Sequence, residues 1–177
     1  MLRSLYYGLL RLVLGASICL SAPSARSDEI PEYRLKAAVI YNFAAFTEWP
    51  TTVGATLNLC IFGPDPFGPE IDGLNGKNVG AHTLAVQRKS TLDELKDCQI
   101  VFVSRSAIDQ IPRLLTIIQG SPTLTVADNP GAARAGIALN LNVAADRISF
   151  EANLEAARSA GIDLSSKLLR LATEVIK

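Results

Sequence analysis

The sequence predicts a single α/β domain, with a mainly parallel sheet flanked by helices in Rossmann-like layers and an antiparallel hairpin near the C-terminus. Short runs rich in Val, Ile and Leu alternate with helical patterns through the middle of the chain, which is typical of parallel strands joined by helices. Two alternating runs late in the chain are separated by only a short turn, which indicates the hairpin. Residues 28–177 have the usual length of one domain.

Residues 1–27 have the three parts of a secretory signal peptide. Arg3 and Arg11 flank a short N-terminal region, an apolar run covers residues 12–20, and small residues close the segment. The run is shorter than the roughly 20 residues that a spanning helix needs. We therefore predict that residues 1–27 are cleaved, and that residues 28–177 form an exported domain that does not insert into the membrane.

The cleavage position has two candidates. Ser27 is favoured, because Ala25 stands three residues before the bond that would be cut, and Ser24 is the alternative. A lipid anchor at Cys19 is not expected, because Ile18 stands where a lipoprotein signal has a small residue.

The first predicted element of the mature chain is a helix over residues 32–47, which lacks Gly and Pro and is followed by Pro50. Apolar residues lie on nearly every side of it, so it must be covered on more than one face, by its own domain or by another chain. Further helices are predicted at residues 69–74, 90–96, 112–119, 153–160 and 165–176. Strands are predicted at residues 56–62, 83–88, 99–104 and 123–127, with the hairpin at 137–141 and 147–150.

The charge of the mature chain argues against nucleic acid as a partner. Loss of the three arginines before residue 28 leaves 14 basic residues against 17 acidic ones, and the two signs are interspersed. A nucleic-acid-binding surface needs a basic patch, which this pattern does not provide.

Cleavage also leaves two cysteines, Cys60 and Cys98. In an oxidising compartment the first hypothesis for such a pair is a disulfide, worth about 4 kcal/mol for a loop of this length. Two buried free thiols are the alternative. A metal site is not expected, because the two thiols and His82, the one histidine, do not supply four ligands.

The sequence lacks the motifs of the common enzyme classes, and we expect no cofactor. Gly76-Lys77 is followed by Asn78 where a phosphate-binding loop requires Ser or Thr, and no dinucleotide fingerprint follows the first strand. No serine in a nucleophile-elbow pattern accompanies His82. We therefore predict that the protein is not an enzyme.

Five polar residues are candidates for binding a partner or a ligand. Asn42 interrupts the apolar first helix, where a buried amide needs partners; a structural hydrogen bond and a ligand contact are both open. Glu151 and Asn153 follow a predicted strand, with Arg158 and Lys167 downstream. This second group is interpreted either as a helix cap or as a binding site.

Several segments, in order, resemble the YfiR family of periplasmic regulators, and together they span nearly the whole mature chain. The first helix "LKAAVIYNFAAFTEWP" is similar to the first helix of that family, and the segments that follow it also match. They are "CIFGPDPFG", "LNGKNV", "LDELKDCQIVFVS", "LTVADNPG" and "ISFEANLEAARSAGIDLSSKLLRLA".

The resemblance implies a periplasmic repressor that binds the periplasmic sensor region of an inner-membrane diguanylate cyclase, and so lowers cyclic-di-GMP and biofilm formation. Redox or envelope stress is thought to release such repression. It also implies a disulfide between Cys60 and Cys98, and it matches Glu151 to an acidic residue connected with repression. Some members carry a second disulfide in the hairpin region, which this chain cannot form because no cysteine follows Cys98.

Three functional hypotheses follow. The preferred one is a repressor that acts by protein contact, as a homodimer whose interface uses the apolar first helix. The alternative is a periplasmic small-molecule-binding module that signals to a membrane sensor kinase or cyclase, and would show a pocket with convergent polar groups near Asn42 or Glu151. An uncharacterised enzyme is the third.

Overall fold

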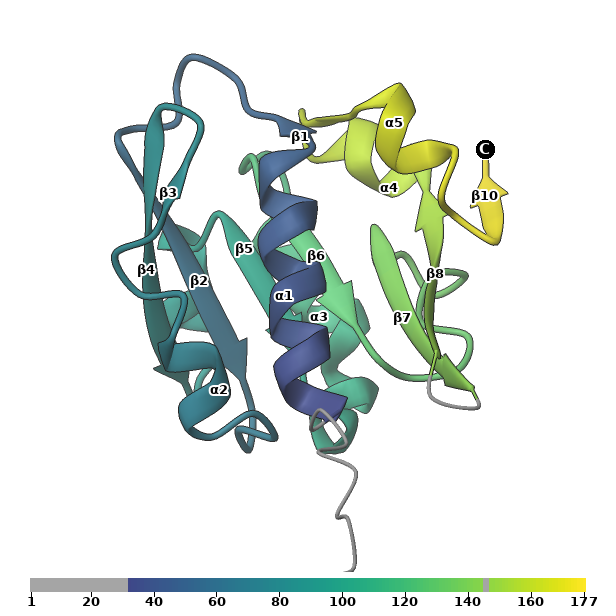
Figure 1. Cartoon of the computed structure of the whole chain (residues 1–177), viewed down its shortest axis with the longest axis horizontal. Coiled ribbons are helices and arrows are strands. Elements are labelled where there is room, and N and C mark those ends of the chain that lie inside the picture. Colours follow the sequence, from purple (N-terminus) through teal and green to yellow (C-terminus); the bar gives the residue numbers. More distant parts are fainter. Residues whose placement is uncertain (1–31, 145–146) are drawn as a thin grey trace, which may run out of the picture.

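The computed structural model describes residues 32–144 and 147–177, which form one mixed sheet with helices packed on it (Figure 1). The predicted signal peptide lies outside the described residues, as do residues 145 and 146 of the predicted hairpin turn. The strands of the sheet are β2 (Thr56–Phe62), β3 (Asn78–Val79), β4 (His82–Lys89), β5 (Ile100–Val103), β6 (Leu124–Ala127), β7 (Leu139–Ala144), β8 (Arg147–Asn153) and β10 (Glu174–Ile176).

From one edge to the other the strand order is β10, β8, β7, β6, β5, β2, β4, β3. The five strands from β4 to β7 are parallel, as the sequence predicts for its middle part. The predicted hairpin is confirmed, because β7 and β8 pair antiparallel. The prediction of a mainly parallel sheet is corrected to a mixed one. The reason is local: the tight β3–β4 turn and the β7–β8 hairpin each reverse the chain, and they add antiparallel pairs towards both ends.

The central strands β5 and β6 are buried along their whole length, and their side chains alternate between two apolar clusters. One cluster joins Leu59, Phe102 and Val126 to the helix α1 (Glu32–Ala45). The other joins Val101 and Val103 to the opposite side of the sheet, where α3 (Ile111–Ile117) packs. A strand that is buried on both faces reads as a continuous apolar run, which is the pattern the sequence shows here.

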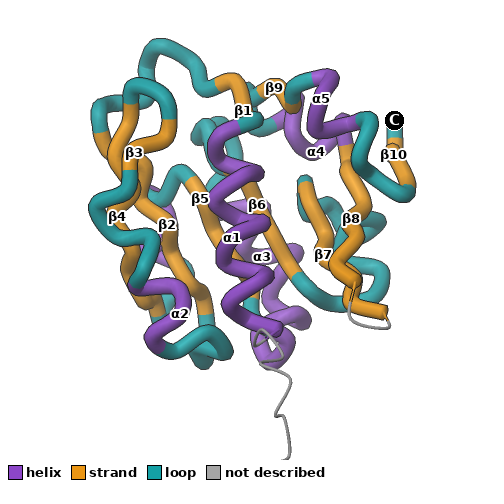
Figure 2. Tube along the Cα trace, viewed as in Figure 1, coloured by secondary structure: helices purple, strands orange, loops and turns teal. Residues whose placement is uncertain are grey.

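The remaining helices are short. They are α2 (Pro69–Asp72), α4 (Leu154–Ser159), α5 (Ser166–Leu169) and the 3₁₀ segments η1 (Asp93–Asp97) and η2 (Arg105–Gln110). The strands β1 (Thr47–Glu48) and β9 (Asp163–Leu164) form a separate antiparallel pair that the sequence did not predict. Figure 2 shows this pair together with α4 and α5 at the same end of the molecule.

The predicted helix over residues 165–176 is wrong beyond Leu169. The N–H and the hydroxyl of Thr173 both donate to the carbonyl of Phe150, which turns the chain onto the edge of β8. β10 then pairs in parallel with β8. Leu171, which the helical stripe required to be covered, is 69% exposed. Val175 and Ile176 are β-branched, so the tertiary pairing and the local preference agree on a strand.

Candidate functional site

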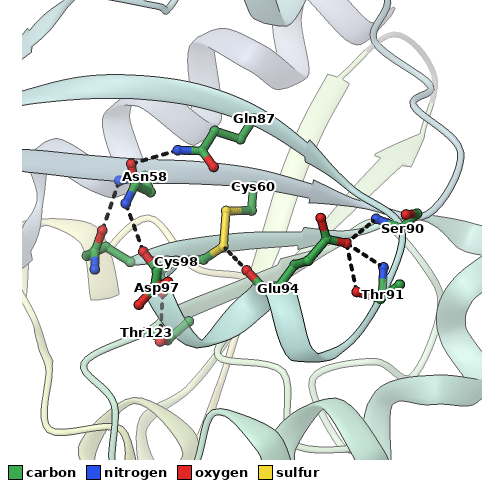
Figure 3. The surroundings of a disulfide bond; sticks show 10 residues. Asn58, Cys60, Gln87, Ser90, Thr91, Glu94, Asp97, Cys98 and Thr123 are labelled. Atoms are coloured by element: carbon green, nitrogen blue, oxygen red, sulfur yellow. Dashed lines mark hydrogen bonds between the residues drawn. A yellow bond between two sulfur atoms is a disulfide. The ribbon is translucent and has the colours of Figure 1, made fainter.

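The two mature cysteines form a disulfide, with their Cα atoms 6.0 Å apart. Cys60 lies on β2 and Cys98 directly after η1, and both are almost completely buried. The bond belongs to an apolar cluster, and polar side chains lie beside it (Figure 3): the Asn58 side chain donates to the carbonyl of Asp97 and accepts from Gln87. The bond therefore joins β2 to the segment that leads into β5.

The carboxylate of Glu94 holds the start of η1, within the helix predicted at residues 90–96. It accepts hydrogen bonds from the backbone of Ser90 and from the backbone and hydroxyl of Thr91 (Figure 3). These bonds lower the pKa of Glu94. The segment is a 3₁₀ turn of 5 residues that ends at Asp97, next to Cys98.

Glu151 lies on β8, with Asn140 of β7 and Glu174 of β10 as its register neighbours. Its carboxylate is half-buried and accepts a hydrogen bond of 3.1 Å from the Asn140 amide. Asn140 is itself completely buried and also accepts from the N–H of Asn129. The amide of Asn140 thus holds the Glu151 carboxylate against the sheet.

Register neighbours and residues two apart on one strand project from the same side of a sheet. Asn140, Asn142, Glu151 and Glu174 therefore share one face, which we call the polar strand face. On the other face of these strands, Phe150 and Ala152 belong to the apolar cluster beneath α1. The sequence carries a signal for this face that we did not use: Leu139-Asn140-Leu141-Asn142 alternates apolar and amide residues.

Asn153 caps a helix, as one of its two interpretations predicts. Its side-chain oxygen accepts from the N–H of Ala156 at the start of α4, and its amide donates to the carbonyl of Ala133. It is 7% exposed. These bonds fix the end of β8 to both α4 and the loop before β7.

The other three candidate residues do not join Glu151. The interpretation of Asn42 as a buried amide is wrong, because Asn42 is exposed on the outer side of α1. The sheet covers the side of α1 that carries Ala37, Ile40 and Phe43 instead. Arg158 on α4 and Lys167 on α5 are also exposed, and among the described residues no ion pair or hydrogen bond connects them to Glu151.

A buried charge cluster that the sequence analysis missed connects α1 to the ends of β5 and β6. Lys36, completely buried, places its Nζ 2.5 Å from Oδ2 of Asp128 and also contacts Glu32. Its ammonium lies 4.4 Å from the centre of the Tyr33 ring. Arg105, which follows β5, donates to the carbonyl of Asp128. Oδ1 of Asp128 is buried, and none of the described residues forms a hydrogen bond with it.

Burial and pairing act in opposite directions on Lys36. Burial alone lowers the pKa of its ammonium, but the hydrogen bonds to Asp128 and Glu32 outweigh this, and the pKa is raised. Burial, with the negative charge of Asp128, raises the pKa of Tyr33. Both groups thus keep their protons at neutral pH, and the cluster acts as a fixed electrostatic link.

Close side-chain contacts lie beyond the carboxyl ends of β2 and β5, the region where open α/β sheets commonly bind ligands. Phe67 packs edge-to-face against Phe102 and Tyr33, with ring centres 4.7 and 5.2 Å apart. Gly63 has φ 89°, and a Cβ there would lie 2.4 Å from the Ser104 hydroxyl. These contacts draw the loops that follow β2 and β5 close together.

A cleft of about 530 Å³ lies between α3 and α4. Thr125 and Asn153 belong to its buried lining, and Arg134 and Glu155 are exposed at its rim. The guanidinium of Arg134 also donates to Glu174, at 2.6 Å. The cleft therefore lies next to the polar strand face, because Arg134 lines the cleft and contacts Glu174 of that face.

Within residues 32–144 and 147–177, no three side chains of His, Cys, Asp or Glu gather as metal ligands would. In the same part of the chain, no helix has the length and apolar character needed to cross a membrane.

The protein is thus a disulfide-linked α/β domain. Its accessible polar groups gather on the polar strand face and in the adjacent cleft. The family model described as YfiR/HmsC-like matches residues 33–173, and the chain belongs to this family. Members of this family are regulators rather than enzymes. The resemblance inferred from the sequence is thereby confirmed.

Among solved structures, the chain is similar to a conserved domain protein from Vibrio cholerae O1 biovar El Tor str. N16961, with a TM-score of 0.54 and 8% identity. The similarity covers 81% of this chain and 60% of that chain. At this identity the likeness shows a shared fold alone.

Proposed function

We propose that the protein is exported to the periplasm and represses an inner-membrane diguanylate cyclase by binding its periplasmic sensor region. Membership of the YfiR/HmsC-like family carries this proposal, since it is consistent with a periplasmic regulator of such a cyclase. Repression lowers cyclic-di-GMP and biofilm formation. A cleaved, anchorless domain acts on cytoplasmic signalling only through a partner that crosses the membrane.

The polar strand face supports this role and gives it a surface. Glu151 is half-buried and positioned by a buried amide, so its carboxylate is presented in one orientation with little entropy left to lose on binding. Its register neighbour Glu174 is engaged by Arg134, whereas no cation pairs with Glu151 among the described residues. The charge of Glu151 is therefore available to a basic or hydrogen-bond-donating group of the partner.

The binding test compares Glu151→Gln with the matched variant Glu48→Gln, which removes an exposed carboxylate elsewhere, on β1. Glutamine keeps an oxygen for the Asn140 amide, so the fold is retained while the charge is lost. We expect Glu151→Gln to weaken binding to the periplasmic domain of the cyclase by about tenfold or more, with Glu48→Gln unchanged. Equal affinity of both variants and the wild type contradicts a role for Glu151.

A homodimer remains a prediction of the proposal. On the outer side of α1, Leu35, Ala38, Asn42 and Ala45 are exposed and uncharged, which suits contact with a second copy. Light scattering should give a dimer mass for the wild type and a monomer mass for Ala38→Glu. A monomeric wild type at micromolar concentrations contradicts the dimer.

The second candidate function is a small-molecule-binding module, and the cleft beside Asn153 favours it. Its volume falls within the range of about 300–1,000 Å³ that is usual for ligand sites. Arg134 connects it to Glu174, and hence to the strand that neighbours Glu151. In this second function, ligand binding in the cleft modulates the polar strand face, which the first candidate function uses to bind the cyclase.

A further inference from the structure

The deep lining of the cleft offers hydrogen-bond donors that the described protein does not use. The hydroxyl oxygen of Thr125 accepts from the N–H of Ala138, and no acceptor among the described residues takes its proton. One N–H of the Asn153 amide donates to Ala133, which leaves the second. Both side chains are more than nine-tenths buried. An occupant of the cleft therefore meets donors there and is best matched by an acceptor oxygen.

The rim carries one charge of each sign. Arg134 and Glu155 are exposed and line the cleft. Arg134 uses part of its guanidinium for Glu174, but a guanidinium has five N–H donors in a fixed fork and can engage a second carboxylate. A ligand that satisfies both rim charges carries a carboxylate and an ammonium group, with no net charge.

The walls combine polar side chains, Thr116, Gln119 and Ser159 among them, with an aliphatic part. Leu115 and Ile118 contribute from the α3 side, and Ala156 and Ala160 from the α4 side. No aromatic residue is in the lining, so a planar ring finds no stacking partner. These walls suit a short, branched hydrocarbon group.

We infer that this cleft binds a small aliphatic zwitterion of the amino-acid or dipeptide class. The ligand carboxylate lies towards Arg134 and the donors of Thr125 and Asn153, its ammonium group towards Glu155, and its aliphatic side chain against Leu115 and Ile118. This inference deepens the second candidate function and rests on it. It does not depend on Glu151 or on contact with a cyclase.

Binding of this kind has a route to the polar strand face. The ligand carboxylate and Glu174 share the guanidinium of Arg134, and Glu174 is the register neighbour of Glu151 in the parallel β8–β10 pair. Asn153, two residues after Glu151 on β8, contacts the same cleft. Occupancy therefore alters the electrostatic surroundings of Glu151 without a change of fold.

Isothermal titration of the mature protein with leucine and with leucyl-leucine tests the inference. We expect saturable binding of at least one, and whichever binds more tightly identifies a free amino acid or a peptide as the source of the zwitterion. Leucinamide, which lacks the carboxylate, and phenylalanine, which needs an aromatic wall, should each bind more weakly.

The variants Arg134→Gln and Glu155→Gln should each weaken binding by about tenfold or more, because each removes a charged hydrogen bond. Arg113→Gln changes an exposed arginine of α3 that is outside the lining, and it should leave binding unchanged. Absence of saturable binding of both probes to the wild type overturns the inference, as does undiminished binding to both rim variants. Either result leaves the Glu151 binding test unaffected, so the two failures are distinguishable.

Discussion

Lys36 on α1 and Asp128 after β6 form an ion pair from which water is excluded: the side chains are 0% and 1% exposed. The pair holds the first helix of the domain to the carboxyl end of a central strand, 92 residues further along the chain. Removing one partner of such a pair leaves a buried charge without that partner. This destabilises a protein by much more than the intact pair stabilises it.

Lys36→Met should therefore lower the free energy of unfolding by about 3–5 kcal/mol. Methionine retains most of the volume, so the loss reports the Asp128 charge, which then keeps only the longer pair with Arg105 at 3.5 Å, rather than a cavity. Urea unfolding measures this loss of stability. The control is Lys96→Met, which removes an exposed ion pair with Asp93 and should change the free energy of unfolding by less than about 1 kcal/mol. Similar stability of the two variants would show that the buried pair does not hold α1.

The same pair predicts the alkaline limit of stability. The folded pKa of Lys36 is raised above its ordinary value of 10.5, so its contribution is complete below that value and is lost as the pH rises through the folded pKa. Unfolding followed from pH 8 to strongly alkaline solution should show a steeper loss for the wild type than for Lys36→Met. Parallel curves would contradict the assignment.

The disulfide should contribute about 4 kcal/mol to the free energy of unfolding. Cys60→Ser is expected to melt at a lower temperature than the wild type without reductant. With the wild type fully reduced before unfolding, the difference should shrink to the small cost of the hydroxyl. Free thiols in the untreated wild type, together with equal melting temperatures for the wild type and Cys60→Ser, would contradict the disulfide.

Two asparagines should behave in opposite ways when replaced by alanine. Asn153→Ala removes the cap of α4 and the bond to Ala133, and should cost about 2–3 kcal/mol. Asn42→Ala alters an exposed position and should stay within about 0.5 kcal/mol of the wild type. Chemical denaturation of both variants is the measurement. A large cost for Asn42→Ala would mean that another chain covers α1.

The sequence predicted those elements in which local pattern and tertiary packing agree. The run from Thr56 to Phe62 forms a strand with these same ends, and the β7–β8 hairpin also forms as predicted. Residues 165–176 have a helical stripe, but the bonds from Thr173 to Phe150 favour strand pairing. The β-branched Val175 and Ile176 are too short a run to predict this strand against the longer helical pattern.

The candidate site was predicted only in part, for the same reason. The cap formed by Asn153 follows from a local rule, and Glu151 was matched through a family resemblance. No local pattern predicts the burial of Lys36, because its partner Asp128 is distant in sequence and is brought near only by the fold. The pair of Arg134 and Glu174 was missed for the same reason, because the two residues are 40 positions apart in the sequence.

The cyclic-di-GMP content of cells tests the central claim most directly. Cells that lack this protein receive the wild type, Glu151→Gln or Glu48→Gln, with equal periplasmic amounts verified. We expect low cyclic-di-GMP in cells with the wild type or Glu48→Gln. In cells with Glu151→Gln we expect cyclic-di-GMP to rise towards the level of cells without the protein. Cyclic-di-GMP that is the same with and without the wild-type protein would contradict the proposed repression.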